Sequence, residues 1–229
     1  ENKEIFELTI GGFGLTGTIV DVTFDLLDFS GLNFSTTVEN VKSTTDTINK
    51  FKNEKNSENF IYSWNRLDQS NKLGNGFIFQ NQINPDNKKI NFKKINYSNY
   101  NRNKKILPFS LWNKFSIKFF NGIYFHFHKF LKNKKYNDDF QSVIFPFIGK
   151  EGYFEMFGTQ GFIESQILVS NKYIDLFIKE FEFLYRKHNP LITLFSIKNM
   201  NGKKNYLRFE DDSICLTFDF VKNKKNLEF

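Results

Sequence analysis

Residues 161–220 constrain the fold of this chain more than any other stretch of its sequence. Apolar residues with the spacing of one helical face predict a helix over residues 174–185, which His188-Asn189-Pro190 ends. Runs of strand-type residues flank this helix, and they cover 161–170, 191–198 and 213–220. Because strands outnumber helices and their spacing is typical of hairpins, the sequence predicts an α+β fold with a largely antiparallel sheet.

The other predicted elements rest on shorter patterns. Apolar and polar residues alternate after a glycine turn, which predicts strand, turn and strand over residues 5–30. One helix is predicted over 38–52, with Asn40 as its cap, and another within 107–127 that ends near Gly122. Further strands are predicted over 59–64, 76–83, 142–148 and 205–209, and a mobile polar loop over 84–105.

The net charge of +7 suggests an anionic partner, but the composition weakens that interpretation. The chain has no alanine and is dominated by Phe, Ile, Asn and Lys, which is typical of an AT-rich genome. Its lysines are spread along the sequence, and no motif that reads a nucleic-acid groove accompanies them. We therefore do not expect a nucleic-acid partner.

The cysteine content and the hydropathy indicate a cytoplasmic protein. Cys215 is the only cysteine, which excludes a disulfide framework and is typical of a reducing compartment. No apolar run approaches the ~20 residues that span a bilayer. Because the chain begins at Glu1, directly before a glycine loop, and ends at Phe229 just after a strand-like run, we expect it to be an internal segment of a longer protein.

The glycine loop in residues 9–26 raises the question of a nucleotide site. Gly12, Gly14 and Gly17 have the spacing of a dinucleotide-binding loop. Such a loop must open a helix, whose N-terminus holds the pyrophosphate, whereas a strand-like run follows here. The sequence therefore excludes that motif and leaves two alternatives: a loop whose amides face a bound group, or a plain glycine turn.

Two histidines have a spacing that metal sites use. His126 and His128 are two residues apart and would share one face of a strand. Because no third ligand is near in sequence, a structural or exposed role is favoured and no metal is expected. No Ser-His-Asp or Cys-His arrangement suggests a catalytic nucleophile, so the catalytic residues stay unassigned.

Two motifs give the chain a resemblance to a known family. They are GGFGLTG at residues 11–17 and FGTQGFIESQ at 157–166, and similar blocks follow in the same order along essentially the whole chain. The chain resembles the FAD-dependent decaprenylphosphoryl-ribose 2-oxidases, which belong to the vanillyl-alcohol-oxidase-like flavoproteins. The resemblance implies that residues 1–30 end an incomplete FAD-binding domain and that 31–229 form the substrate-binding domain, truncated at its C-terminus.

The resemblance also implies positions for the site residues. The residues expected to contact FAD are Gly12, Phe13, Gly14, Gly17, Ile19 and Thr217. Those expected on the substrate side are Glu164, Gln166, Lys198 and Cys215, and either Trp64 or Arg66 takes the place of a pocket tryptophan. Glu164 stands where the family carries an amide, and a carboxylate there disfavours phosphate but accepts hydrogen bonds from sugar hydroxyls.

The implied activity is oxidation of a secondary alcohol on a sugar by hydride transfer to FAD. The expected substrate is a polyprenyl-phosphate-linked pentose, whose 2-oxidation is the first half of an epimerisation that a partner short-chain dehydrogenase completes. Two interpretations stay open for the basic residues 84–105: a solvated loop, which is favoured, and contact with an anionic membrane at its surface. Two alternatives stay open: an FAD-linked enzyme for another alcohol or hydroxy acid, and a non-catalytic basic module that binds polyanions. We expect the segment alone to be inactive.

Overall fold

The computed structural model describes most of the chain. The described residues are 2–26, 33–53, 60–68, 73–84, 106–147, 150–202, 208–209 and 211–229. The predicted loop over 84–105 lies outside them except for Asn84, and so do most residues of the predicted strand at 205–209.

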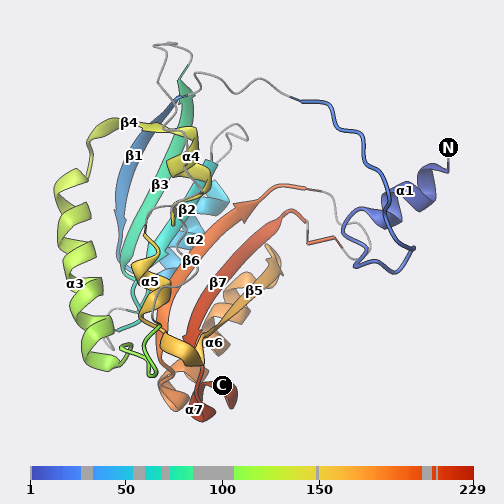
Figure 1. The fold of residues 1–229 in the computed structure, drawn as a ribbon. Coiled ribbons are helices and arrows are strands. Elements are labelled where there is room, and N and C mark those ends of the chain that lie inside the picture. Colours follow the sequence, from blue (N-terminus) through green and yellow to red (C-terminus); the bar gives the residue numbers. More distant parts are fainter. Residues whose placement is uncertain are drawn as a thin grey trace.

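A sheet of seven antiparallel strands forms the centre of the molecule (Figure 1). Its spatial order is β4-β1-β3-β2-β6-β7-β5. The strands are β1 (Asn33–Val41), β2 (Phe60–Asn65), β3 (Gly76–Asn84), β4 (Lys135–Asp139), β5 (Phe162–Ser170), β6 (Ile192–Met200) and β7 (Ser213–Val221). The predicted α+β class with a largely antiparallel sheet is confirmed, and β4 is an addition that the sequence patterns did not indicate.

Helices lie on both sides of this sheet (Figure 1). The described helices are α1 (Lys3–Thr9), α2 (Thr44–Asn53), α3 (Lys114–Leu131), α4 (Phe140–Ile144), α5 (Gly152–Glu155), α6 (Ile174–His188) and α7 (Lys224–Leu227), with a short 3-10 turn at Gly158–Gln160. The larger core cluster packs α2 and α6 against one face of the sheet. On the other face, side chains of α3 pack against β1, β2 and β3.

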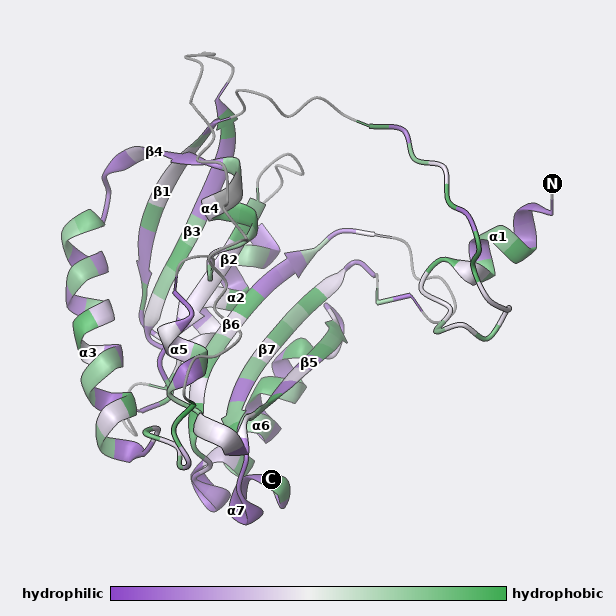
Figure 2. Ribbon diagram, in the orientation of Figure 1, coloured by the Kyte–Doolittle hydropathy of each residue, from purple (hydrophilic) through white to green (hydrophobic). Residues whose placement is uncertain are grey.

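Hydrophobic residues recur at alternate positions along β6 and β7 (Figure 2). Because alternate side chains share a face, both strands bury one apolar face beneath α6. The rings of Phe195 and Phe218 stack with centroids 4.7 Å apart, and Phe181 of α6 lies 4.9 Å from Phe218. The predicted apolar stripe of α6 is confirmed, since its buried residues include Ile174, Ile178, Phe181 and Tyr185. The left-handed Asn189 ends the helix, as the sequence predicts.

Of the strand, turn and strand predicted for residues 5–30, the turn is present at residues 10–16, but the two strands are wrong where the structure describes them. Residues 3–9 form α1, which begins because the Asn2 side chain accepts hydrogen bonds from the amides of Glu4 and Ile5. Residues 18–26 form no strand, and Val20 and Leu26 are 85% and 91% exposed. An alternating pattern yields a strand only where a neighbouring strand pairs with its backbone, and no such pairing is described for this segment.

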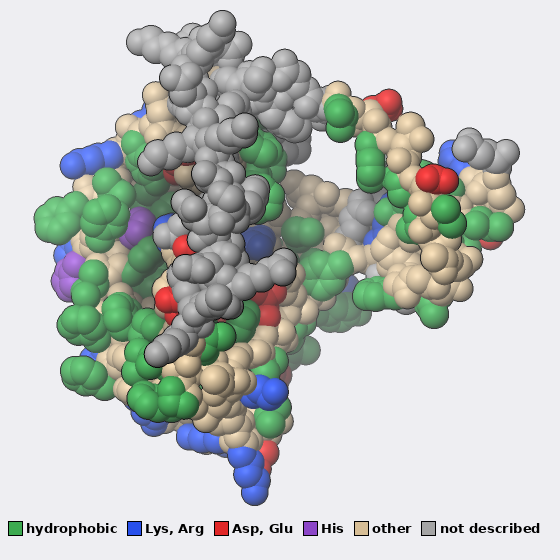
Figure 3. Space-filling view, in the orientation of Figure 1, with side chains coloured by type: hydrophobic (Ala, Val, Ile, Leu, Met, Phe, Trp, Pro, Cys, Tyr) green, Lys and Arg blue, Asp and Glu red, His purple; other side chains and the backbone are tan. Residues whose placement is uncertain are grey.

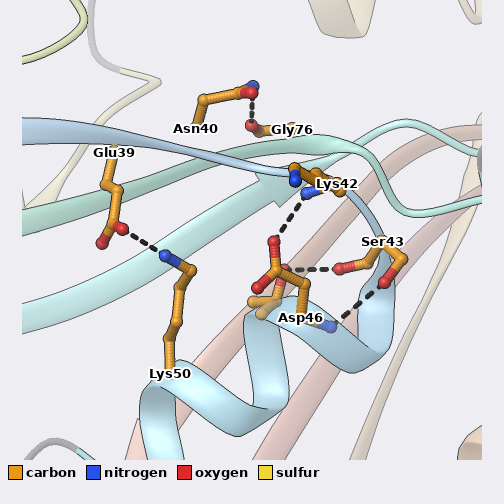
Figure 4. Close-up of polar contacts among 8 residues, drawn as sticks. Glu39, Asn40, Lys42, Ser43, Asp46, Lys50 and Gly76 are labelled. Atoms are coloured by element: carbon orange, nitrogen blue, oxygen red, sulfur yellow. Dashed lines mark hydrogen bonds and ion pairs between the residues drawn. The ribbon is translucent and has the colours of Figure 1, made fainter.

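The helix predicted over 38–52 begins later than expected, at Thr44. Asn40 is a residue of β1, and its side chain donates to the carbonyl oxygen of Gly76 on β3 (Figure 4). Ser43 takes the capping role instead, since its hydroxyl oxygen accepts a hydrogen bond from the Asp46 amide. A strand thus extends through residues that also fit a helical stripe, because pairing with β3 satisfies their backbone groups.

Two further predictions differ from the structure. The predicted helical segment near 107–127 does not end at Gly122 but continues to Leu131, after a capping box between Asn113 and Ser116 starts it. The strand predicted over 142–148 is absent from the described residues, and α4 occupies part of that range. A single glycine costs a helix only about 1 kcal/mol, so packing of the long helix on the sheet outweighs it.

Candidate functional site

Three neighbouring strands carry the residues predicted for the substrate and flavin side. In the β5–β7 pairing, Gln166 lies opposite Thr217, and Cys215 precedes Thr217 by two residues on β7. In the β6–β7 pairing, Lys198 lies opposite Cys215. Glu164 precedes Gln166 by two residues and therefore shares its face. The five predicted positions thus form one patch on β5, β7 and β6.

This patch lies on the face of the sheet opposite α6. Phe218 and Phe220 belong to the core beneath α6, so the alternate residues of β7, Cys215 and Thr217, point to the other side. Their spacing of two residues already places Glu164 and Gln166 on one face of β5, and Cys215 and Thr217 on one face of β7. What the structure adds is that the three strands are adjacent and that their register turns both pairs and Lys198 to the same side.

The members of the patch differ in exposure. Glu164, Gln166 and Lys198 are exposed, and the Gln166 amide donates to the Glu164 carboxylate over 2.6 Å. Cys215 and Thr217 are buried, at 2% and 5% exposure, with their sulfur and hydroxyl oxygen 4.0 Å apart. The exposed part of the patch therefore consists of charged and hydrogen-bonding side chains, and its buried part consists of two small polar groups, a thiol and a hydroxyl.

The Cys215 thiol is protonated at neutral pH. Burial raises its pKa, and the Glu164 carboxylate adds to the rise. The Thr217 hydroxyl and the Lys198 ammonium act in the opposite direction, but burial is the largest of these effects. A thiol with a raised pKa is a poor nucleophile, so the geometry gives Cys215 a role in lining the patch rather than in covalent chemistry.

Asp219 is a member of this face that the sequence reasoning missed. It lies opposite Glu164 across the β5–β7 pairing and is 1% exposed. Its Oδ2 accepts a hydrogen bond of 2.7 Å from the Tyr153 hydroxyl, which also lies 2.7 Å from the Thr193 hydroxyl. Desolvation raises the pKa of Asp219 to about 6, against the effect of the Tyr153 hydrogen bond, and the charge of Glu164 adds to the rise.

An available signal pointed to Asp219, namely an acidic residue within the apolar run of β7. Its partner Tyr153 comes from α5, 66 residues away in sequence, and no local pattern connects the two. A buried carboxyl with a pKa near 6 exchanges its proton close to neutral pH, which is a property of acid–base groups.

The two alternatives for an aromatic pocket residue have different places. Trp64 lies opposite Ser196 on β6, which lies opposite Thr217, so Trp64 faces the same side as the patch. Its ring lies 4.4 Å from Tyr124 of α3, which covers it. Arg66 is buried in an ion pair with Asp68. Of these two alternatives, Trp64 is thus the one that shares the face of the patch.

The glycine loop lies apart from this patch, beyond the ends of β6 and β7 (Figure 1). Phe13, Gly14 and Gly17 have positive φ angles of 53°, 75° and 134°. Within the loop, the Gly12 and Gly17 amides donate to backbone carbonyl oxygens. The Arg208 guanidinium joins this segment to the rest of the chain, with hydrogen bonds to the Ile10 carbonyl and the Glu7 carboxylate.

The loop has features that suit a flat bound group. A Cβ built at Gly14 or Gly17 would meet nothing within 4 Å, so another molecule has room to approach the backbone closely. Phe13 and Ile19 are exposed apolar side chains on either side of these glycines. The loop and the sheet patch are not joined into one cavity by the described residues, so they form two separate parts of the predicted site.

The two histidines lie on α3 rather than on a strand. His128 is buried, with Nδ1 2.9 Å from the Tyr124 carbonyl oxygen, whereas His126 is exposed on a different side of the helix. Burial lowers the pKa of His128. Among the described residues, no group of three or more His, Cys, Asp or Glu side chains is placed to hold a metal ion.

No protein-family model and no curated protein matches the sequence.

Proposed function

We propose that this chain is part of an FAD-dependent oxidoreductase that oxidises a secondary alcohol of a sugar. The observation that supports it is the patch on β5, β7 and β6, where Glu164, Gln166, Lys198, Cys215 and Thr217 share one face. These positions lie on three separated segments of the sequence, and it is the family resemblance that indicates them. Their common face is what a substrate site would require.

The chain's own residues suit the cofactor at the glycine loop. The open backbone at Gly14 and Gly17, with the exposed side chains of Phe13 and Ile19, would hold part of FAD. When bound, FAD supplies the acceptor for a hydride. Thr217 lies on the sheet face and would line the flavin side of the substrate there.

The charges of the patch favour a phosphosugar with a defined orientation. The Glu164 carboxylate accepts hydrogen bonds from hydroxyl groups and repels phosphate, whereas the exposed Lys198 ammonium attracts it. Gln166 offers both a donor and an acceptor between these two charges. A sugar with its hydroxyls at β5 and its anionic group at β6 suits this arrangement, which favours a polyprenyl-phosphate-linked pentose over a simple hydroxy acid.

The visible spectrum of the whole protein that the gene encodes tests the cofactor. We expect flavin bands after purification, or after addition of FAD, and bleaching of these bands by polyprenyl-phosphoryl ribose. Bleaching by hydroxy acids instead would favour an FAD-linked enzyme of another substrate class. A protein without flavin bands that binds no added FAD would overturn both enzyme proposals and favour a polyanion-binding module.

Replacing Lys198 with alanine should weaken the phosphosugar substrate without releasing FAD. Losing a hydrogen bond to a charged group costs about 1.5–3 kcal/mol, so we expect KM to rise about tenfold or more at unchanged flavin content. Lys179→Ala is the matched control, because Lys179 is an exposed lysine of α6 on the opposite side of the sheet. Steady-state kinetics and the flavin-to-protein ratio measure the two effects, and flavin loss in Lys198→Ala would contradict its placement on the substrate side.

A further inference from the structure

Helix α3 exposes a stripe of large apolar side chains along its outer side. The stripe consists of Phe115, Phe119, Ile123, Phe127 and Phe130, each between 54% and 78% exposed. Their spacing of three or four residues places them on one side of the helix. Figure 2 shows hydrophobic residues along the whole length of α3, with hydrophilic ones between them, and Figure 3 shows apolar side chains gathered over it at one edge of the molecule.

The packing of α3 on the sheet does not use this stripe. Ile117 and His128 are the buried residues of the helix, and Phe125 and Leu131 pack beside them against β1, β2 and β3. With about 100° per residue, Phe119 and Phe130 point away from these positions. The apolar residues of α3 thus occupy one side that packs on the sheet and a second side that is exposed. A contiguous exposed patch of aromatic residues marks a surface that binds something.

The charges around the stripe favour an anionic partner. Between residues 114 and 135 there is no Asp or Glu, while the basic residues are Lys114, Lys118, Lys129, Lys132, Lys134 and Lys135. Lys114, Lys118 and Lys129 lie along one flank of the stripe by helical spacing. A second copy docking through the same face would bring these lysines together, so this charge disfavours self-association.

Helix α6 provides a contrast within the same molecule. It also has exposed apolar side chains, Leu176 and Phe183, on its outer side. Asp175, Glu180 and Glu182 lie among its basic residues, so its outer side has no single sign of charge. Helix α3, unlike α6, combines an exposed apolar stripe with a flank whose charged residues are all basic.

We propose that α3 binds in the interface of an anionic lipid bilayer, with its phenylalanine stripe in the boundary of headgroups and acyl chains and its lysines on the lipid phosphates. This combination is characteristic of helices that lie on a membrane. No described helix is long and apolar enough to cross a bilayer, so the binding is peripheral in this part of the chain. The surface is separate from the patch on β5, β7 and β6 and does not depend on FAD.

Sedimentation of the full chain with lipid vesicles tests the proposal. We expect binding to vesicles of phosphatidylcholine with phosphatidylserine, and weak binding to phosphatidylcholine alone. The double change Phe119→Ser and Phe127→Ser should reduce the partition coefficient about tenfold or more, since two aromatic side chains leave the lipid. The matched control is Leu176→Ser with Phe183→Ser on α6, which should bind as the wild type does.

A second pair of variants separates charge from apolar contact. Lys118→Gln and Lys129→Gln should each lower binding to the anionic vesicles about fivefold and reduce its sensitivity to salt. Because the changed side chains are exposed, we expect all variants to keep the fold, and circular dichroism checks this. Equal binding of the α3 and α6 double variants would overturn the proposal. The proposal would also be overturned if the wild-type chain did not bind anionic vesicles, or if sedimentation equilibrium showed that it dimerises through α3.

Discussion

Replacing Asp68 with alanine should lower the free energy of unfolding by about 3–5 kcal/mol, because it leaves the Arg66 guanidinium charged and buried without its partner. Both side chains are only 5% exposed. The Arg66 Nε donates to Oδ1 of Asp68 over 2.9 Å, and Nη2 donates to Oδ2 over 2.6 Å. A bidentate ion pair of this kind is strong where water is excluded. Equilibrium unfolding in urea, followed by tryptophan fluorescence, measures the loss.

The loss should be large because the pair also joins separate elements. The Asn121 side chain of α3 donates to Asp68 over 3.2 Å, and the Arg66 guanidinium lies 5.4 Å from the centre of the Phe125 ring. On the other side, the Tyr185 hydroxyl of α6 donates to the Leu67 carbonyl oxygen. Residues 66–68, which directly follow β2, therefore connect α3 and α6, and disorder there would loosen both helices.

Two further variants make the prediction specific. Asp175→Ala breaks an ion pair with Lys52 in which the Asp175 side chain is 69% exposed, and it should cost less than about 1 kcal/mol. Arg66→Met combined with Asp68→Leu removes both charges and should recover much of the stability that Asp68→Ala loses. An Asp68→Ala variant no less stable than Asp175→Ala would contradict a buried, partner-dependent charge.

The sequence predicted those parts of the fold that depend on local periodicity. The stripe of α6 and the apolar runs of β5, β6 and β7 are confirmed because each element buries one face, and burial imposes the period that the sequence displays. The predictions failed where partners decide the outcome. In residues 18–26, apolar and polar residues alternate as in a strand, but no strand pairing is described for them. The segment around Asn40 pairs with β3 instead of forming the predicted helix.

The candidate site was predictable only in part, for a related reason. The resemblance indicated which positions belong to the patch, but only strand order and register bring Lys198, Thr217 and Gln166 to one side. The Asp219–Tyr153 contact joins residues far apart in sequence, and burial gives the carboxyl its raised pKa. Neither burial nor distance between separate segments is visible in local patterns. The exposed stripe on α3 could not be predicted for the same reason, since the side of the helix that packs on the sheet and the exposed side are both apolar in sequence.

Replacing Asp219 with asparagine should stabilise the protein by about 2 kcal/mol above about pH 7 and flatten its pH dependence. Burial raises the pKa of Asp219 from an ordinary value of 3.8 to about 6, so the folded protein holds this proton in a range where the unfolded chain has released it. The free energy of unfolding therefore falls as pH rises from about 4 to about 6, by about 3 kcal/mol in all. Asparagine removes most of this cost, because it stays uncharged and still accepts the Tyr153 hydrogen bond.

The difference between wild-type and Asp219→Asn stability, measured in urea from acid to neutral pH, isolates this carboxyl from other acidic groups. Two neighbours should then move the midpoint of that difference in opposite directions. Tyr153→Phe removes the hydroxyl that stabilises the carboxylate and should raise the midpoint, while Glu164→Gln removes a nearby negative charge and should lower it. An exposed carboxylate would show neither effect, since water would screen both.

The carboxyl carbon of Asp219, followed by NMR, reports the same proton directly. We expect it to titrate near pH 6 and to shift upward in Tyr153→Phe, in parallel with the unfolding data. Titration near pH 4, or an Asp219→Asn variant whose stability still falls through the same window, would contradict a buried and protonated carboxyl. Because Asp219 lies opposite the exposed Glu164 on the neighbouring strand, release of its proton near neutral pH would add a second negative charge to this end of the patch. Binding of an anionic ligand beside Glu164 should therefore weaken above about pH 6, and binding to Asp219→Asn should not.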